Sequence, residues 1–198
     1  MIPGKIVNSI ELLGLGEKGW NALAAESPTR SIFQTYQWVF SWEKIFKEQC
    51  DPWYLSVEDR SGIVGVAPLM IRREPLGKRV VRFLGDGKAD YCDFLLVGNR
   101  PVVLEKIFEP VFAAQDRSDA IVLNGIPSES PTIPWIRAIC SNAGYRLLER
   151  ILYPSPVLLM KDRREEVGRI FNKSGLRRRQ NYFQRQGRLD YKTLSNGD

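Results

Sequence analysis

Residues 53–97 read WYLSVEDRSGIVGVAPLMIRREPLGKRVVRFLGDGKADYCDFLLV, and this stretch decides the fold class. Four segments rich in β-branched and aromatic residues alternate with turns built from Gly, Pro and Asp; the segments are residues 53–58, 63–72, 79–84 and 91–97. Links this short join antiparallel strands, because a parallel pair needs a crossover of a dozen or more residues. The pattern predicts consecutive antiparallel strands, with an edge or a bulge at Pro68, which has no N–H for a ladder.

Helical patterns lie on both sides of this strand region. Trp38, Trp42, Ile45 and Phe46 share one face of a helix expected over residues 36–47. An apolar stripe marks a second helix over residues 101–114, with a kink expected at Pro110. Further helices are expected at residues 20–26 and 133–143, further strands at 120–123, 145–152 and 157–160, and a helical tail from 164 that breaks near 175 and ends in a strand at 189–193. A strand with nothing after it must pair elsewhere, so we expect the sequence to continue into a further domain.

Composition narrows the class of protein. The chain has 198 residues, of which 43% are hydrophobic and 26% are charged, the balance of a globular protein with an apolar core. No apolar run approaches the ~18 residues that a membrane span requires. The N-terminus lacks the charged and apolar regions of a secretion signal, so we expect a cytoplasmic protein.

The residue types that are missing restrict the chemistry. Histidine is absent, which excludes Ser-His-Asp and Cys-His catalysis and every His-based metal site. Cys50, Cys92 and Cys140 lie far apart without a C-x-x-C pair, so we expect reduced, mostly buried thiols and no metal centre. Catalysis would have to use carboxylates, Tyr, Lys, Arg, backbone dipoles or water.

Charge divides the chain into two parts. Residues 161–198 contain 11 Lys or Arg and 5 Asp or Glu, whereas residues 1–160 contain 18 of each class, so the whole net charge of +6 lies in the tail. We therefore expect a domain over residues 1–160, followed by a basic linker helix and the start of a second domain over 161–198. A basic tail indicates an anionic partner, a solvated helix face, or both.

Two loops are candidates for function. GLGEKG at residues 14–19 matches the dinucleotide pattern G-x-G-x-x-G, but no parallel βαβ unit surrounds it, and we interpret it as a turn before a helix. GDGKADYCD at residues 85–93 brings three aspartates and a tyrosine between two strands. The simplest interpretation is a polar turn. The functional one is an acceptor site, in which Asp90 and Asp93 flank Tyr91 and hold an amine or hydroxyl.

Arginines dominate the tail. Arg177, Arg178 and Arg179 are consecutive, and Arg185 and Arg188 follow. Three consecutive residues spread over about 200° of a helix, so these three arginines are not expected to serve one ligand together. A solvated helix face, a phosphate-bearing ligand and nucleic acid are the three interpretations that this run leaves open.

Several segments, in order along the chain, resemble a group of GNAT-type acetyltransferases that includes the CelD-like proteins associated with bacterial cellulose biosynthesis. The segments are FQTYQW at residues 33–38 with Trp42, GIVGVAPLM at 62–70, RFLG at 82–85, DYCDF at 90–94, and LRRRQN at 176–181 running into RQG at 185–187. The group is similar to the Fem-type aminoacyltransferases, which carry two GNAT-like halves. The match covers nearly the whole chain.

The resemblance implies an α/β (α+β) fold with a GNAT-like mixed, largely antiparallel sheet flanked by helices. It implies an N-acyltransferase that forms the acceptor side, with acetyl-CoA or another acyl-CoA as co-substrate rather than a tightly bound cofactor. Tyr36, Trp38, Asp90, Tyr91 and Asp93 are the candidate acceptor contacts, whereas the catalytic base is unassigned. The acceptor would be a small molecule, a sugar or an amine, with a link to polysaccharide or cell-envelope synthesis.

This chain departs from the family pattern in the donor half. The Q/R-x-x-G-x-G/A turn that cradles the donor's phosphates is missing from the sequence, so the resemblance implies that a second half binds acyl-CoA. Arg177, Arg178, Arg179 and Arg185 remain candidates for binding an anion. Two alternatives stay open: a nucleic-acid-binding protein that uses the basic tail, although we expect no specific nucleic acid, and a non-catalytic pseudoenzyme.

Overall fold

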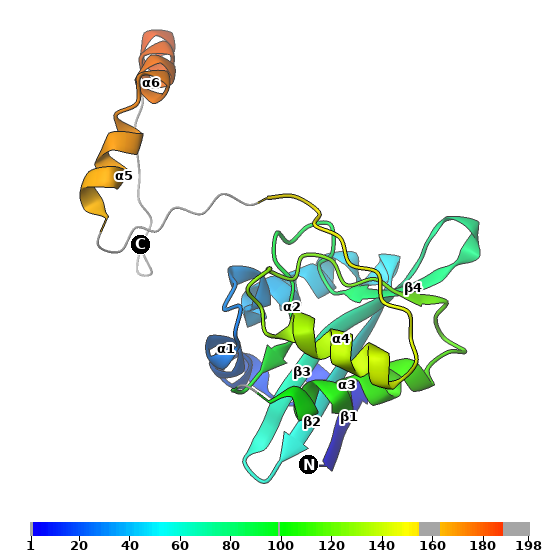
Figure 1. The fold of residues 1–198 in the computed structure, drawn as a ribbon. Coiled ribbons are helices and arrows are strands. Elements are labelled where there is room, and N and C mark those ends of the chain that lie inside the picture. Colours follow the sequence, from blue (N-terminus) through cyan, green and yellow to red (C-terminus); the bar gives the residue numbers. More distant parts are fainter. Residues whose placement is uncertain (1, 99, 155–162, 188–198) are drawn as a thin grey trace. The chain divides into compact units, whose positions relative to one another are not determined.

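The computed structural model describes residues 2–98, 100–154 and 163–187. These residues form two separate units, Met1–Leu152 and Tyr153–Asp198, which are described one at a time. The elements of the first unit are β1 (Ile2–Val7), α1 (Gly16–Glu26), α2 (Tyr36–Phe46), β2 (Asp51–Asp59), β3 (Gly62–Arg73), β4 (Arg79–Phe83), β5 (Leu95–Leu96), α3 (Pro101–Ala113), β6 (Ala120–Ile121) and α4 (Thr132–Asn142) (Figure 1). The second unit contains α5 (Arg164–Phe171) and α6 (Ser174–Gln186).

The first unit is built on one mixed sheet with the strand order β1-β2-β3-β4-β6, and β5 pairs with β3 beyond the end of β4. All pairings are antiparallel except that of β4 with β6. The expected mixed, largely antiparallel sheet flanked by helices is therefore confirmed. A parallel pair requires a crossover connection, and α3 lies in the chain between β4 and β6.

Alternation along the strands divides the core into two layers. Trp53, Leu55 and Val57 of β2 pack into the cluster that includes the apolar stripe of α3, whereas Tyr54 points to the cluster formed with α1 and α2. Helices therefore cover both faces of the sheet, α3 and α4 on one side and α1 and α2 on the other (Figure 1). This arrangement follows from the period of two in a strand, because successive side chains point to opposite faces.

α3 packs closely against β3 at Gly65. A Cβ added at this position would lie 2.3 Å from Cγ1 of Val103 in α3, which is too short for any contact between carbon atoms. The glycine in the GVAPL segment is thus explained by helix–sheet packing. The helix continues through Pro110 as one element, and the kink expected there stays a prediction.

Pro68 lies inside the sheet, at a position where its missing N–H costs no ladder bond. β3 pairs with β5 at Val66 and with β4 from Leu69 onward, so neither strand pairs with the two residues between. The carbonyl of Pro68 accepts a hydrogen bond from the N–H of Leu84 at 2.8 Å. Because N and O of a strand residue point to the same side, the proline nitrogen faces this interruption.

Several sequence-based expectations were wrong in detail. The fourth strand is only Leu95–Leu96 and pairs with β3, because residues 91–94 belong to a loop. Residues 145–152 contain no strand. On α2 the buried positions are Val39, Trp42 and Glu43, whereas Ile45 is 66% exposed. The strand β1 was missed. The expected strands at 157–160 and 189–193 lie outside the described residues, as does Arg188.

Other expectations were confirmed. The tail is helical and is interrupted between Phe171 and Ser174, close to the expected break. Helix α4 ends next to Gly144, whose φ of 73° is left-handed. Cys92 and Cys140 are buried free thiols, and Cys50 is half-buried. None of the helices in the described ranges is both long enough and apolar enough to cross a membrane.

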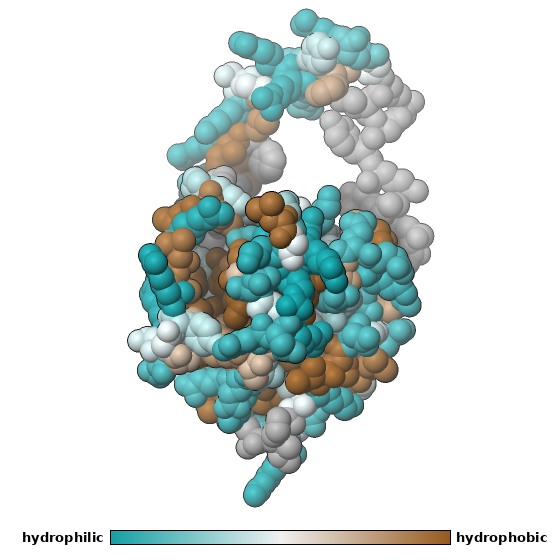
Figure 2. Space-filling view, turned by 90° about the vertical axis from the view of Figure 1, so that its right-hand side faces the viewer, coloured by the Kyte–Doolittle hydropathy of each residue, from teal (hydrophilic) through white to brown (hydrophobic). Residues whose placement is uncertain are grey.

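Apolar side chains also reach the surface of the described residues. Leu148 is 85% exposed and Ile151 is 91% exposed, in the segment that follows α4. Figure 2 shows hydrophobic residues, in brown, between hydrophilic ones on one face of the molecule. Scattered exposure of this kind is common in soluble proteins and assigns no site by itself.

Candidate active site

The chain leaves the sheet as a loop after β4 and re-enters it as β5. Both strands pair with β3, one after the other along the same edge. Phe83 at the end of β4 is opposite Leu69, and Leu95 at the start of β5 is opposite Val66. The two strands are therefore successive parts of one line beside β3, interrupted by residues 84–94. We call these residues the interstrand loop. Because β4 and β5 are interrupted here, this polar loop lies next to the backbone of β3 in the middle of the sheet.

The interstrand loop lies beside β4 and β6, which form the parallel pair among the described strands. Val80 and Val81 of β4 are opposite Ala120 and Ile121 of β6, and both strands run toward the loop. Beyond β6, the carbonyl of Gly125 accepts a hydrogen bond from the N–H of Cys92 at 3.0 Å, which fastens the loop to the chain after β6. The carboxyl ends of parallel strands are the common position of ligand sites in α/β sheets. The loop is therefore the best-placed candidate site of the first unit.

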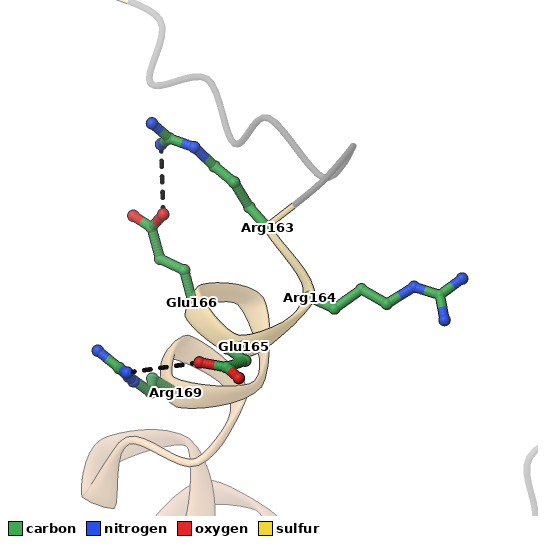
Figure 3. A pocket seen from close by; sticks show the side chains of 5 residues that line it. All are labelled: Arg163, Arg164, Glu165, Glu166 and Arg169. Carbon is green, nitrogen blue, oxygen red and sulfur yellow. Dashed lines mark ion pairs between the residues drawn. The ribbon is translucent and has the colours of Figure 1, made fainter.

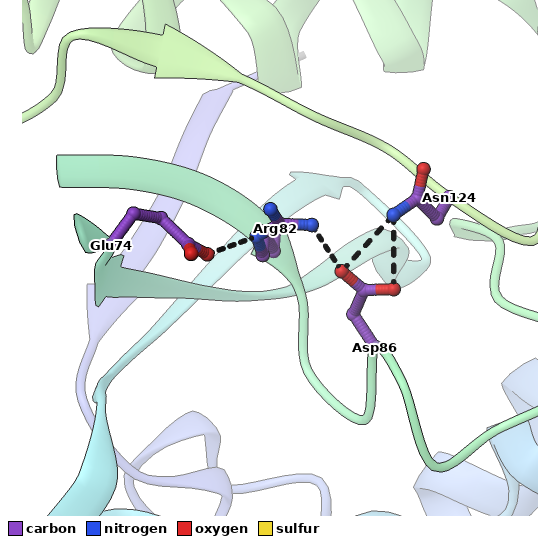
Figure 4. A network of polar contacts seen from close by, with 4 residues as sticks. All are labelled: Glu74, Arg82, Asp86 and Asn124. Carbon is purple, nitrogen blue, oxygen red and sulfur yellow. Dashed lines mark hydrogen bonds and ion pairs between the residues drawn. The ribbon is translucent and has the colours of Figure 1, made fainter. Parts of the chain in front are cut away.

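The first end of the interstrand loop carries a network of charged side chains (Figure 4). Asp86 accepts a hydrogen bond from Nη1 of Arg82 at 2.6 Å, and both of its oxygens lie 3.3 Å from Nδ2 of Asn124. Nε of Arg82 donates to Glu74 at 3.0 Å. The side chains of Arg82 and Asp86 are 19% and 13% exposed, so water reaches them. With two carboxylates and one guanidinium, the network carries one net negative charge, which favours a cationic or hydrogen-bond-donating group nearby.

The second end of the loop is fastened by a buried aspartate. Asp93 is 1% exposed, and its oxygens accept hydrogen bonds from the hydroxyls of Thr29, Ser130 and Thr132 and from the N–H of Phe94. The Ser130 and Thr132 contacts are 2.6 Å and 2.9 Å. Burial raises the pKa of Asp93, and the four hydrogen bonds oppose this without cancelling it. The side chain connects the loop to α4 and to the segment before α2.

The N-terminal part of α2 and the segment before it form one wall of the interstrand loop. Nε2 of Gln34 donates to the carbonyl of Asp93 at 3.3 Å, so the FQTYQW segment fixes the end of the loop. The indole nitrogen of Trp38 lies 3.5 Å from the position that a Cβ of Gly85 would occupy. That nitrogen is buried and donates no hydrogen bond within the described residues. Gly85 has a φ of 95°, a conformation that suits glycine.

The five acceptor candidates from the sequence do not come together as a group. Asp90 is exposed and Tyr91 is half-buried in the middle of the interstrand loop. Trp38 contacts the loop at Gly85, whereas Tyr36 stacks on Phe40 with ring centroids 5.3 Å apart. Two residues apart on a helix means about 200° apart around it, which explains this separation.

The fifth candidate, Asp93, is placed so that it holds the interstrand loop. All of its hydrogen-bonding capacity is directed to protein groups, as described above. Sequence reasoning missed Asp86 as a partly exposed aspartate of the loop, together with its partners Arg82, Glu74 and Asn124. The RFLGD order carried a signal, because Arg82 and Asp86 stand four residues apart. Nothing local predicts Asn124, which comes from the segment after β6, 38 residues away from Asp86.

The chemistry available at the interstrand loop is that of carboxylates, a tyrosine and backbone groups. Asp86 offers a partly exposed carboxylate that could orient an amine or accept a proton through water. The thiol in the loop is not a suitable nucleophile, because burial raises the pKa of Cys92 to about 12. The described residues contain no cluster of three or more Cys, Asp or Glu side chains arranged to hold a metal ion.

The arginine candidates belong to the second unit and lie on α6. Arg177, Arg178 and Arg185 line one recess together with Ser174, Asn181 and Tyr182. Arg179 is not among the residues that line it. Consecutive residues differ by 100° on a helix, so two of the three consecutive arginines share a face and the third points away.

Comparison with solved structures identifies two similar acetyltransferases. An aminoglycoside acetyltransferase from an uncultured soil metagenomic sample superposes with a TM-score of 0.50 at 16% identity, over 80% of this chain and 100% of the other. A probable acetyltransferase superposes with a TM-score of 0.47 at 12% identity, over 80% of this chain and 99% of the other. The chain has a fold found in acetyltransferases. No family model matches the sequence, and no curated protein matches it. The likeness at this identity is one of fold.

Proposed function

We propose that this chain is an acyl-CoA-dependent N-acyltransferase of the GNAT type that provides the acceptor side of the reaction. The observation that carries the proposal is the polar interstrand loop, which opens inside the sheet at the carboxyl ends of β4 and β6. The fold shared with an aminoglycoside acetyltransferase supports the reaction class. The net negative network around Asp86 supports an acceptor that carries an amine.

The proposed reaction is direct transfer. The acceptor's amine nitrogen attacks the thioester carbonyl carbon, a tetrahedral oxyanion forms, and its collapse breaks the carbon–sulfur bond. The sulfur leaves as a thiolate and becomes the free thiol by taking up, through the base and solvent, the proton that the nitrogen loses. The proton that the nitrogen loses passes to a base, and Asp86 is our candidate, directly or through a water molecule. Asp90 and Tyr91 would contact the acceptor from the middle of the loop, and Trp38 would form the wall beside Gly85. Backbone N–H groups are the donors that such an oxyanion requires.

The donor side is proposed to need a second GNAT-like unit. An acyl-CoA needs convergent backbone N–H groups for its pyrophosphate, usually from a glycine-rich turn before a helix. Helix α3 begins with Arg100 as the N-cap and Pro101 next to it, so one of the first N–H groups is missing. We further propose that the acceptor is an amine-bearing sugar or a related small molecule of polysaccharide or cell-envelope synthesis.

Release of free thiol from acetyl-CoA tests this proposal. The assay uses a panel of amines that includes amino sugars, with the chain alone and with a second GNAT-like unit supplied as a separate protein. We expect release only with the second unit, and we expect Asp86→Asn to lower the rate roughly 100-fold or more, the typical contribution of a general base. Glu105→Gln removes an exposed carboxylate of α3 and is the matched control.

Each outcome of this assay has a distinct meaning. The absence of release under both conditions, from protein that is folded by circular dichroism, would contradict the transferase proposal. Release by the chain alone would retain the transferase and remove the need for a second unit. Release that is equal in the Asp86→Asn and Glu105→Gln variants would show that the base lies elsewhere.

A further inference from the structure

The two helices of the second unit differ in how their charges are compensated. In the segment that forms α5, Arg163 pairs with Glu166 at 3.3 Å and Arg169 pairs with Glu165 at 3.8 Å, while Arg164 points away (Figure 3). Helix α6 contains four arginines and no acidic residue. Within residues 163–187, no carboxylate pairs with an arginine of α6. Nη2 of Arg177 donates to Oδ1 of Asn172 at 3.1 Å, but this partner is neutral, so within these residues no carboxylate compensates the positive charge of α6.

The available charge is concentrated on one side of α6. The residues that line its recess are Ser174, Arg177, Arg178, Asn181, Tyr182 and Arg185, and we call them the arginine face. Arg177 and Arg178 stand two turns before Arg185, which is about 10–12 Å along the axis at 1.5 Å per residue. The face thus presents two positive positions with an aromatic ring between them. Leu176 and Phe183, seven residues apart, lie outside the recess.

The side chains of the arginine face suit a nucleotide. Guanidinium groups bind phosphate through a planar fork of donors, and they retain their charge at any physiological pH. The ring of Tyr182 is 59% exposed, which leaves a surface on which a base can stack. Asn181 and Ser174 add an amide and a hydroxyl for polar contacts. A ligand that fits would carry phosphates at two separate positions and a planar ring.

We propose that the arginine face binds the nucleotide end of the acyl-CoA donor, which carries a pyrophosphate, a 3′-phosphate and an adenine ring. The proposal rests on the acyltransferase function proposed above. The proposal is consistent with the need for a second GNAT-like unit on the donor side. An exposed helix can attract the phosphates of acyl-CoA, but it does not position the thioester for reaction. Binding at an exposed face is weak and decreases with salt.

A long nucleic acid fits the arginine face less well than a single nucleotide. Proteins that bind single strands use a basic track that follows the backbone over several nucleotides. Here the basic surface amounts to one helix of 13 residues, and residues 1–160 have no net charge. A ligand with a few phosphates close together matches the size of the positive patch.

The experiment is a titration of the full chain with adenosine 3′,5′-bisphosphate, followed by NMR chemical shifts at low ionic strength. This probe has no acyl group, so the result does not depend on catalysis. We expect Arg178→Gln to weaken binding about fivefold, in line with the loss of one exposed charge-assisted contact. Arg179→Gln removes the same charge from the adjacent residue, outside the face, and we expect less than a twofold change. Tyr182→Leu is expected to weaken the bisphosphate and to leave inorganic pyrophosphate unaffected.

Three results would overturn the inference. One is equal weakening by Arg178→Gln and Arg179→Gln, which would show that only the net charge matters. Another is the absence of bisphosphate binding at low salt. The third is tighter binding, site for site, of a single-stranded oligonucleotide than of the bisphosphate, which would assign the face to nucleic acid. Acyl transfer is measured in a different experiment, the thiol-release assay. A failure of that assay would contradict the proposed function and would not change the result of the bisphosphate titration.

Discussion

Asp86 and Asp93 fasten the two ends of the same loop by different means. Asp86 is held by a guanidinium and an amide, and its side chain is 13% exposed. Asp93 is held by three hydroxyls and a backbone N–H, and it is 1% exposed. One carboxylate sits in a charged network with a net negative charge, and the other is surrounded by neutral donors. A buried, fully engaged carboxylate serves to position the loop, whereas a hydrated one beside a cation can also meet a substrate.

The comparison gives the two aspartates opposite roles. Replacing Asp93 should affect the stability of the fold before it affects chemistry, because three of its four partners would be left buried without an acceptor. Replacing Asp86 should affect chemistry before stability, because each of its partners retains another partner or water. Each prediction below tests one side of this contrast.

The largest effect is expected for Asp93→Ala. The substitution leaves the N–H of Phe94 and the hydroxyls of Ser130 and Thr132 without their acceptor in a buried site. Unsatisfied buried polar groups cost about 1–3 kcal/mol each, and Ser130 and Thr132 can partly compensate by bonding to each other, so we expect a loss of about 3 kcal/mol in the free energy of unfolding. Urea denaturation followed by tryptophan fluorescence measures it.

The control for Asp93→Ala is Lys88→Ala, at the exposed middle of the interstrand loop. A change within about 0.5 kcal/mol is expected there, as for other surface substitutions. A loss for Asp93→Ala as small as that of the control would show that the hydroxyl cluster does not hold the loop.

The fold was largely readable from sequence because alternation and short turns are local signals. The hairpin of β2 and β3 follows from residues 53–72, and the pairing of β4 with β3 follows from the turn after Arg73. The parallel pairing of β6 depends on the α3 crossover and has no local signature.

Ile45 and Glu43 show a second limit of sequence-based prediction. Helical period alone placed Ile45 inside, but Glu43 is buried because Tyr54 and the N–H of Ile10 donate hydrogen bonds to it.

The candidate site was only partly readable, because its partners come from distant segments. The sequence indicated the loop through its aspartates, and it named Asp90, Tyr91 and Asp93. It could not show that Asp93 is enclosed by Thr29, Ser130 and Thr132, which are 37 or more residues away. For the same reason Asn124 was not connected with Asp86. Long-range contacts of polar side chains leave no period in the sequence.

The next effect is a change in the pH dependence of stability. Burial raises the pKa of Asp93 in the folded protein above the value of about 3.9 expected for the unfolded chain. Between these two values the folded protein keeps a proton that the unfolded chain has lost, so its stability falls as the pH rises through this window. The slope contributed by one such group is at most about 1.4 kcal/mol per pH unit.

Asp93→Asn removes this titration while keeping the shape of the side chain. We expect its unfolding free energy, measured by urea denaturation from roughly pH 4 to pH 7, to decline less with pH than that of the wild type. The difference between the two curves isolates Asp93, since the other titrating groups are common to both. Parallel curves, or a steeper decline in the variant, would contradict the raised pKa of Asp93.

The smallest effect on stability is expected for Asp86→Ala, at about 1 kcal/mol. Arg82 keeps its contact with Glu74 at 3.0 Å, so the substitution leaves no buried charge alone. Asn124 is half-exposed and can bond to water instead. Ion pairs that water can reach typically contribute no more than this.

The double variant Glu74→Ala with Asp86→Ala sharpens the test, because Arg82 then loses both carboxylates. We expect the double variant to lose more stability than the sum of the two single variants, since either carboxylate alone satisfies the guanidinium. Urea denaturation of the four proteins gives the coupling energy directly. A loss for Asp86→Ala alone that equals the loss for Asp93→Ala would mean that both ends of the interstrand loop are structural, and it would leave Asp90 as the loop's carboxylate for the proposed acceptor.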